Sequence, residues 1–171
     1  MNSHDTQATF DAWLRDHAGI LHHVANAFAT GADRHDLMQE LMLALWRAIP
    51  AFRAASLPST FIYRVTHNAA LTWKRAERGH RRRIDSFHEL QPDPGDSTHD
   101  VSADSTTDKL ELLYSAIRSL EPLDRSLVLL QLDSVSYAQI AEIHGLTESN
   151  VGVRLNRIKQ KLTAIIQEKT S

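Results

Sequence analysis

The chain has 171 residues, which is enough for one ordinary domain or for two small ones. It contains no cysteine, which excludes a disulfide scaffold, a thiolate metal site and a cysteine nucleophile. No run of about 18 apolar residues occurs, and the first residues lack a signal-peptide pattern. We therefore expect a soluble, cytoplasmic protein that does not insert into a membrane.

The net charge of −2 conceals two opposite blocks. Residues 64–83 carry seven basic side chains and one acidic one, whereas residues 84–108 carry seven acidic side chains and no Lys or Arg. A basic block suits the phosphate backbone of a nucleic acid, and an acidic segment mimics or repels one.

Helical periodicity dominates the first half of the chain. Apolar residues recur every three or four positions and predict helices at residues 6–29, 33–50 and 56–78. Gly31 separates the first two, and Pro50 ends the second. No alternation typical of strands interrupts this pattern.

Residues 84–106 differ in composition from the segments on either side. They combine turn-forming residues with acids and offer little to bury, which indicates a flexible acidic linker. Helical spacing resumes at Thr107 and continues to the C-terminus. The predicted fold class is therefore all-α, with two small helical domains at residues 1–83 and 107–171.

The strongest motif is a helix-turn-helix over residues 136–157. Ser136 is a natural N-cap, Gly145 suits a sharp turn, and Thr147 caps the following helix. Val151 and Leu155 then predict its buried side. The opposite side, with short polar residues first and cations later, suits a helix in the DNA major groove.

Two N-terminal patterns are open to more than one interpretation. The helix over residues 36–49 carries a narrow polar stripe that suits docking onto a partner or is simply a solvated edge. Residues 52–78 interleave aromatic side chains with cations, which is typical of single-stranded nucleic acid binding or of a core with a charged surface.

Taken together, the sequence resembles bacterial RNA polymerase sigma factors of the small extracytoplasmic-function (ECF) group. Residues 36–40 (Asp-Leu-Met-Gln-Glu) and 61–68 (Phe-Ile-Tyr-Arg-Val-Thr-His-Asn) are similar to motifs of sigma region 2. Residues 120–123 and the helix-turn-helix are similar to sigma region 4. The resemblance covers roughly residues 8–83 and 107–165.

This resemblance implies two partners, core RNA polymerase and promoter DNA, and an inhibitory anti-sigma factor as a further one. It implies no cofactor and no metal. Core polymerase would contact the first motif: Asp36, Leu37, Gln39, Glu40 and Leu41. The −10 promoter element would be melted and held by a second set: Phe52, Arg53, Ser56, Arg64, His67, Asn68, Lys74, Arg75 and Arg78.

The resemblance assigns the −35 promoter element to the helix-turn-helix. Its contacts would be Thr147, Glu148, Ser149, Asn150, Val153, Arg154, Asn156, Arg157, Lys159 and Lys161. The acidic linker would thread toward the polymerase catalytic channel.

Two other functions compete with this interpretation. A stand-alone helix-turn-helix regulator with a sensing or dimerising N-terminal half would bind duplex DNA without polymerase. An enzyme is disfavoured, because the sequence has no phosphate-binding loop, nucleophile elbow or paired-carboxylate constellation.

Overall fold

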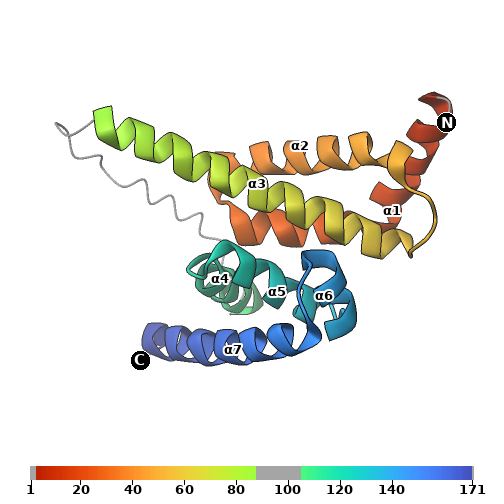
Figure 1. The fold of residues 1–171 in the computed structure, drawn as a ribbon. Helices are drawn as coiled ribbons and strands as arrows, with labels where there is room; N and C mark the ends of the chain where they lie inside the picture. Colours follow the sequence, from red (N-terminus) through yellow and green to blue (C-terminus); the bar gives the residue numbers. More distant parts are fainter. Residues whose placement is uncertain (1–2, 88–104, 171) are drawn as a thin grey trace.

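The structure, a computed structural model, describes residues 3–87 and 105–170 (Figure 1). The N-terminal half consists of α1 (Ser3–Phe28), α2 (Gly31–Ala48), the short 3-10 helix η1 (Ile49–Ala51) and α3 (Pro58–Phe87). Helices α1, α2 and α3 all contact one another and form a three-helix bundle.

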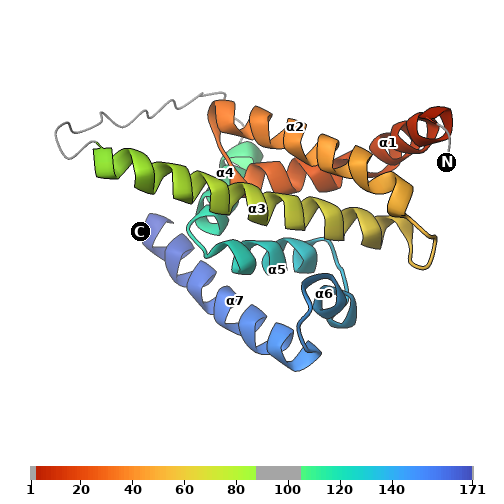
Figure 2. The same ribbon diagram turned by 45° about the horizontal axis from the view of Figure 1, so that its top comes forward.

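The C-terminal half consists of four helices. They are α4 (Ser105–Arg118), α5 (Pro122–Leu132), α6 (Tyr137–His144) and α7 (Glu148–Thr170). Helix α7 packs against α4, α5 and α6 and lies on the far side of this group from the N-terminal bundle (Figures 1 and 2).

The all-helical prediction is confirmed for the described residues, none of which lies in a strand. Helix boundaries differ from the prediction in two places. Helix α2 begins at Gly31 rather than at residue 33, with Thr30 as its N-cap. Helix α3 runs to Phe87 and α4 begins at Ser105, so both ends of the predicted linker are helical. Residues 88–104, the rest of that linker, lie outside the described residues.

The apolar periodicity places the expected side chains in the core. Phe28, Leu45 and Ile62 are no more than 1% exposed in the N-terminal bundle, and Leu127 and Leu155 are 0% exposed in the C-terminal half. One hydrophobic cluster includes the residues of both halves. Burial of this cluster removes apolar surface from water, which is the main favourable contribution to folding.

The two halves pack directly against each other. Helix α1 contacts α4 and α5, and α3 contacts α5 and α6. Both views show α5 lying between α3 and α7 (Figures 1 and 2). The C-terminal half therefore covers one side of α3 in this arrangement.

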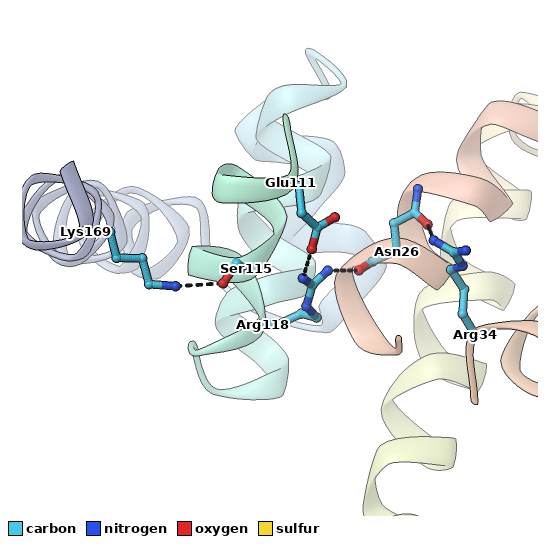
Figure 3. Close-up of polar contacts among 6 residues, drawn as sticks. All are labelled: Asn26, Arg34, Glu111, Ser115, Arg118 and Lys169. Atoms are coloured by element: carbon cyan, nitrogen blue, oxygen red, sulfur yellow. Dashed lines mark hydrogen bonds and ion pairs between the residues drawn. The ribbon is translucent and has the colours of Figure 1, made fainter. Parts of the chain in front are cut away.

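A polar bridge joins α4 to the C-terminal end of α1 (Figure 3). Arg118 donates to the backbone carbonyl of Asn26 over 3.0 Å and also pairs with Glu111. The amide oxygen of Asn26 accepts from Arg34 at the start of α2 over 3.3 Å. Beyond α4, Lys169 of α7 donates to Ser115 over 2.6 Å. Arg118 thereby binds one of the last backbone carbonyls of α1, which no intrahelical donor satisfies.

Candidate nucleic-acid interface

The helix-turn-helix prediction is confirmed in its geometry. Ser136 and Gln139 form a capping box, in which the Ser136 hydroxyl accepts from the Gln139 amide over 3.3 Å. Gly145 ends α6 with a φ of 66°, a left-handed conformation that costs glycine little. Thr147 then accepts from the Asn150 amide over 3.2 Å at the start of α7. These local interactions fix how α7 leaves α6.

Helix α7 has a buried side and a free side. Val151 and Leu155 are 0% exposed and Ile158 is 1% exposed, so they attach the helix to the rest of the C-terminal half. Every residue assigned to the −35 element is exposed: Thr147, Glu148, Ser149, Asn150, Val153, Arg154, Asn156, Arg157, Lys159 and Lys161. The structure therefore presents nine of these side chains on α7 and the tenth, Thr147, at its N-terminus.

Two of these residues also interact within the protein. The Thr147 hydroxyl caps α7, and Arg154 forms an ion pair with Asp124 of α5 over 2.8 Å. Val153 is the largest exposed apolar side chain of α7, at 50% exposure. An apolar side chain on such a helix suits contact with the methyl group of thymine.

The predicted polymerase-docking motif on α2 divides between surface and core. Asp36, Gln39 and Glu40 are not buried and form one polar stripe. Leu37 and Leu41 are 0% exposed and pack inside the bundle. The prediction that these two leucines touch a partner does not fit this arrangement, because their spacing places them on the core side of the helix.

Phe52 does not fit its predicted role as a free aromatic surface for DNA bases. It is partly buried and packs edge-on against Trp13 at a centroid distance of 5.2 Å and beside Phe61 at 5.1 Å. Arg53 next to it is exposed, and Ser56 is partly exposed, in the segment between η1 and α3. The aromatic cluster thereby positions this segment against the bundle.

The polar residues predicted to hold the −10 element differ in their surroundings. Arg75 and Asn68 are exposed on α3. Lys74 pairs with Glu77 on the same helix over 2.6 Å.

Two cations of α3 instead pair with carboxylates of the C-terminal half. Arg64 lies 3.4 Å from Glu142 of α6, and Arg78 lies 3.5 Å from Glu121, the N-cap of α5. Acidic groups thus occupy the places at which phosphates would neutralise these arginines.

His67, which the family resemblance places against DNA, is instead 0% exposed. Its Nδ1 contacts the hydroxyl of Ser126 on α5, and the same hydroxyl lies 2.9 Å from Nε2 of His144 on α6. Nε2 of His67 is buried without a hydrogen-bond partner. His67 is therefore part of the interface between the halves in this arrangement.

Burial sets the protonation state of this cluster. Desolvation, with a smaller contribution from His144, lowers the pKa of His67 from 6.5 to about 3. Desolvation also lowers the pKa of His144 from 6.5 to about 4. Both imidazoles are neutral near pH 7. Sequence reasoning missed Ser126 and His144, since no local pattern links His67 to Ser126, which is 59 positions away.

A cavity of about 280 Å³ lies beside this cluster, between the halves. His23 of α1 lies 3.0 Å from Asp133, the C-cap of α5, and both line the cavity with Tyr63. Burial, together with the charge of Asp133 and a hydrogen bond to it, raises the pKa of Tyr63 to about 12. Tyr63 is therefore a neutral hydroxyl at physiological pH.

Among residues 3–87 and 105–170, no group of three or more His, Asp or Glu side chains could hold a metal ion. No helix in the described ranges is long and apolar enough to cross a membrane.

The sequence matches two family descriptions in chain order. Residues 7–80 match sigma-70 region 2, and residues 110–162 match sigma-70 region 4. The chain is 28% identical to the RNA polymerase sigma factor YlaC of Bacillus subtilis, over 74% of this chain and 73% of that protein. It is 25% identical to the ECF RNA polymerase sigma-E factor of Escherichia coli K12, over 84% of this chain and 79% of that protein.

Two solved structures share the fold. One is the sigma factor RpoE in complex with the anti-sigma factor NepR from Bartonella quintana, with a TM-score of 0.68 and 18% identity over 93% of this chain and 97% of that chain. The other is CnrH in complex with the cytosolic domain of CnrY, with a TM-score of 0.63 and 19% identity over 95% of this chain and 90% of that chain.

Proposed function

Because this chain belongs to the ECF group of sigma factors, we propose that it binds core RNA polymerase, recognises the −35 and −10 promoter elements and promotes promoter melting. The observation that carries this proposal is the exposed side of α7. Nine of the ten residues that the family resemblance assigns to the −35 element are exposed on this helix, which Val151, Leu155 and Ile158 anchor, and the tenth, Thr147, is exposed at its N-terminus.

The exposed side of α7 supports duplex DNA recognition. Asn150 and Asn156 offer amide groups that can pair with adenine edges, and Arg157 offers a guanidinium that can pair with guanine. Lys159 and Lys161 follow along the same helix and suit phosphate contacts.

The polar stripe of α2 supports docking onto polymerase. Asp36, Gln39 and Glu40 project from a helix whose opposite side is fully packed in the bundle. A rigid acidic stripe suits a basic surface on a large partner, which it would find by electrostatic attraction. Leu37 and Leu41 support this docking only indirectly, by holding α2 in place.

The −10 element is assigned to α3 and to the segment before it. Arg53, Asn68 and Arg75 are exposed while the two halves are packed together. Arg64 and Arg78 pair with carboxylates of the C-terminal half, and His67 is buried against it, so DNA contacts by these three residues would replace contacts between the halves. Melting also requires a flipped base to be held, at a cost of a few kcal/mol of unstacking.

An anti-sigma factor belongs to the proposed partners. Of the solved structures that share the fold, RpoE is bound to the anti-sigma factor NepR and CnrH is bound to the cytosolic domain of CnrY. Functional units follow the helices: α1–α3 for polymerase and the −10 element, and α4–α7 for the −35 element.

Reconstituted transcription tests the proposal. Core RNA polymerase, freed of other sigma factors, is incubated with fragmented genomic DNA with and without the purified protein, and transcript 5′ ends are sequenced. We expect new start sites only when the protein is present, each preceded by a shared pair of elements at −35 and −10.

A protein carrying both Asn150→Ala and Arg157→Ala serves as the comparison, since both side chains are exposed and their removal leaves the buried side of α7 intact. It should lose the −35 preference while the −10 preference remains. Selection of a duplex site by the protein alone, with no new start sites, would show a stand-alone regulator instead.

A further inference from the structure

Part of the α3 surface assigned to the −10 element is occupied by the protein's own C-terminal half. Arg64 pairs with Glu142, Arg78 pairs with Glu121, and His67 is buried against Ser126. These three contacts extend along more than three turns of α3. A DNA strand that bound these side chains would compete with the C-terminal half for them.

The contacts at the two ends of this interface are weak individually. The side chains of Arg64 and Glu142 are 41% and 59% exposed, and those of Arg78 and Glu121 are 46% and 73% exposed. Exposed ion pairs contribute little and are screened by salt. The buried part of the interface must therefore be the main determinant of how the two halves pack together.

That buried part contains one hydroxyl between two imidazoles. Ser126 is 0% exposed, and it contacts Nδ1 of His67 on one side and Nε2 of His144 on the other. The two rings lie 6.1 Å apart between centroids, at an angle of 79°. A serine hydroxyl has one proton, so it donates to one imidazole and accepts from the other.

We propose that the C-terminal half is an autoinhibitory cover for the −10 surface, and that the cluster of His67, Ser126 and His144 is a proton-sensitive latch that releases this cover on acidification. The assignment of α3 to the −10 element rests on the proposed function. The latch itself rests on the interface alone.

The charged neighbours do not stabilise a protonated cluster. On α3, Tyr63 is a neutral hydroxyl and Arg64 is a cation. The carboxylate of Glu142 on α6 is occupied by Arg64, and that of Asp133 next to α5 contacts Tyr63 and His23 of α1.

Other titratable groups lie to either side of the cluster. Asp16 and His17 of α1 line the cavity next to Tyr63. On the α2 side, Asp33 shares a second cavity of about 110 Å³ with Lys74, Glu77, Arg118 and Arg125, farther along α3.

The sign of the pH dependence follows from burial. In the closed form, with the two halves packed together, both imidazoles have a pKa below the ordinary 6.5. The open form, in which the halves are separated, therefore binds more protons. The closed form is fully favoured above about pH 7 and loses stability as the pH falls from about 6.5 toward 4. Between pH 7.5 and 5.5, each histidine should shift the equilibrium toward the open form about tenfold, and the two together about a hundredfold.

A distance measurement across the interface tests the latch. Because the chain has no cysteine, Arg15→Cys on α1 and Gln160→Cys on α7 give a protein with two unique labelling positions, both exposed. Energy transfer between the two dyes is recorded from pH 7.5 to 5.5. We expect it to fall in the otherwise unchanged full-length chain while the circular dichroism of the helices persists.

The variants identify the responsible groups. His67→Gln and His144→Gln should each make the pH-dependent change in the ratio of open to closed form about tenfold smaller. His22→Gln, at an exposed position on α1, should leave this change as it is in the unsubstituted chain. Glu142→Arg changes only an exposed residue and should lower energy transfer already at pH 7.5, by repulsion from Arg64. Constant energy transfer down to pH 5.5, or an unchanged profile in both histidine variants, would overturn the latch.

A second readout separates the latch from the proposed function. Binding of a fluorescent single-stranded DNA oligonucleotide to the full-length chain should tighten on acidification, and His144→Gln should reduce this gain relative to His22→Gln. Separation of the halves without any gain in DNA binding would overturn the inhibitory role and the assignment of α3 to DNA, while the latch would stand.

Discussion

The capping box of Ser136 and Gln139 stabilises the first turn of α6. Ser136→Ala removes the acceptor of the Gln139 backbone amide and leaves that group dependent on water. We expect the free energy of unfolding to fall by about 1 kcal/mol, the usual effect of removing such a cap. Urea denaturation followed by circular dichroism measures it.

The matched control for this variant is Ser149→Ala, in the first turn of α7, where the side chain is exposed. Its stability should change by no more than about 0.5 kcal/mol. Equal decreases in the two variants would show that the capping box does not stabilise the helix-turn-helix.

The residues of the nucleic-acid surfaces were predictable where a local pattern determines exposure. Helical spacing separates Val151 and Leu155 from the polar residues of α7, and the structure confirms this division. The same spacing shows why Leu37 and Leu41 are buried, although a family motif alone assigns them to a partner. His67 could not be placed from sequence, because its burial depends on Ser126 in a distant helix.

At the scale of elements, the helices were predictable and their ends were not. Capping residues and the φ of 66° at Gly145 define the helix-turn-helix, and both depend on local sequence. Helix α3 continues past Gly79 to Phe87, because one glycine weakens a helix without ending it and the next proline is Pro92. Composition alone suggests a linker from residue 84 onward.

Along α7, the proposed phosphate contacts of Lys159 and Lys161 follow the residues proposed to contact bases. Lys159→Ala together with Lys161→Ala should weaken promoter binding by the holoenzyme about equally at all sequences. The slope of log affinity against log salt should become shallower by about 0.9 for each phosphate that a lysine no longer neutralises. Binding titrations at several salt concentrations measure this slope.

The comparison for this prediction is Val153→Ala, which removes an exposed apolar group without changing charge. It should change the preference among −35 sequences and leave the salt slope unchanged. A change of slope in Val153→Ala, or altered sequence preference in the double lysine variant, would contradict the proposed division.

At the scale of the whole molecule, the sequence order of the two units was predictable and their packing was not. Each unit has its own periodicity, whereas the interface depends on pairs such as His23 with Asp133, which are 110 positions apart. The same interface pairs glutamates of the C-terminal half with arginines of α3. As a result, part of the α3 surface that is accessible in the isolated N-terminal bundle is covered in the full chain.

Docking of α2 onto core RNA polymerase is the step on which the proposed function depends. The most direct measurement is a binding titration of labelled full-length protein against core polymerase that lacks any sigma factor. Asp36→Arg combined with Glu40→Arg reverses two exposed charges of the stripe, and Asp11→Arg combined with Glu168→Arg reverses two exposed charges elsewhere.

We expect tight, saturable binding by the wild type and by the Asp11/Glu168 control. The Asp36/Glu40 variant should bind roughly tenfold to a hundredfold more weakly, because repulsion replaces attraction at the docking surface. Equal binding by all three proteins would contradict the role of α2, and no binding by the folded wild type would contradict the proposed function as a polymerase subunit.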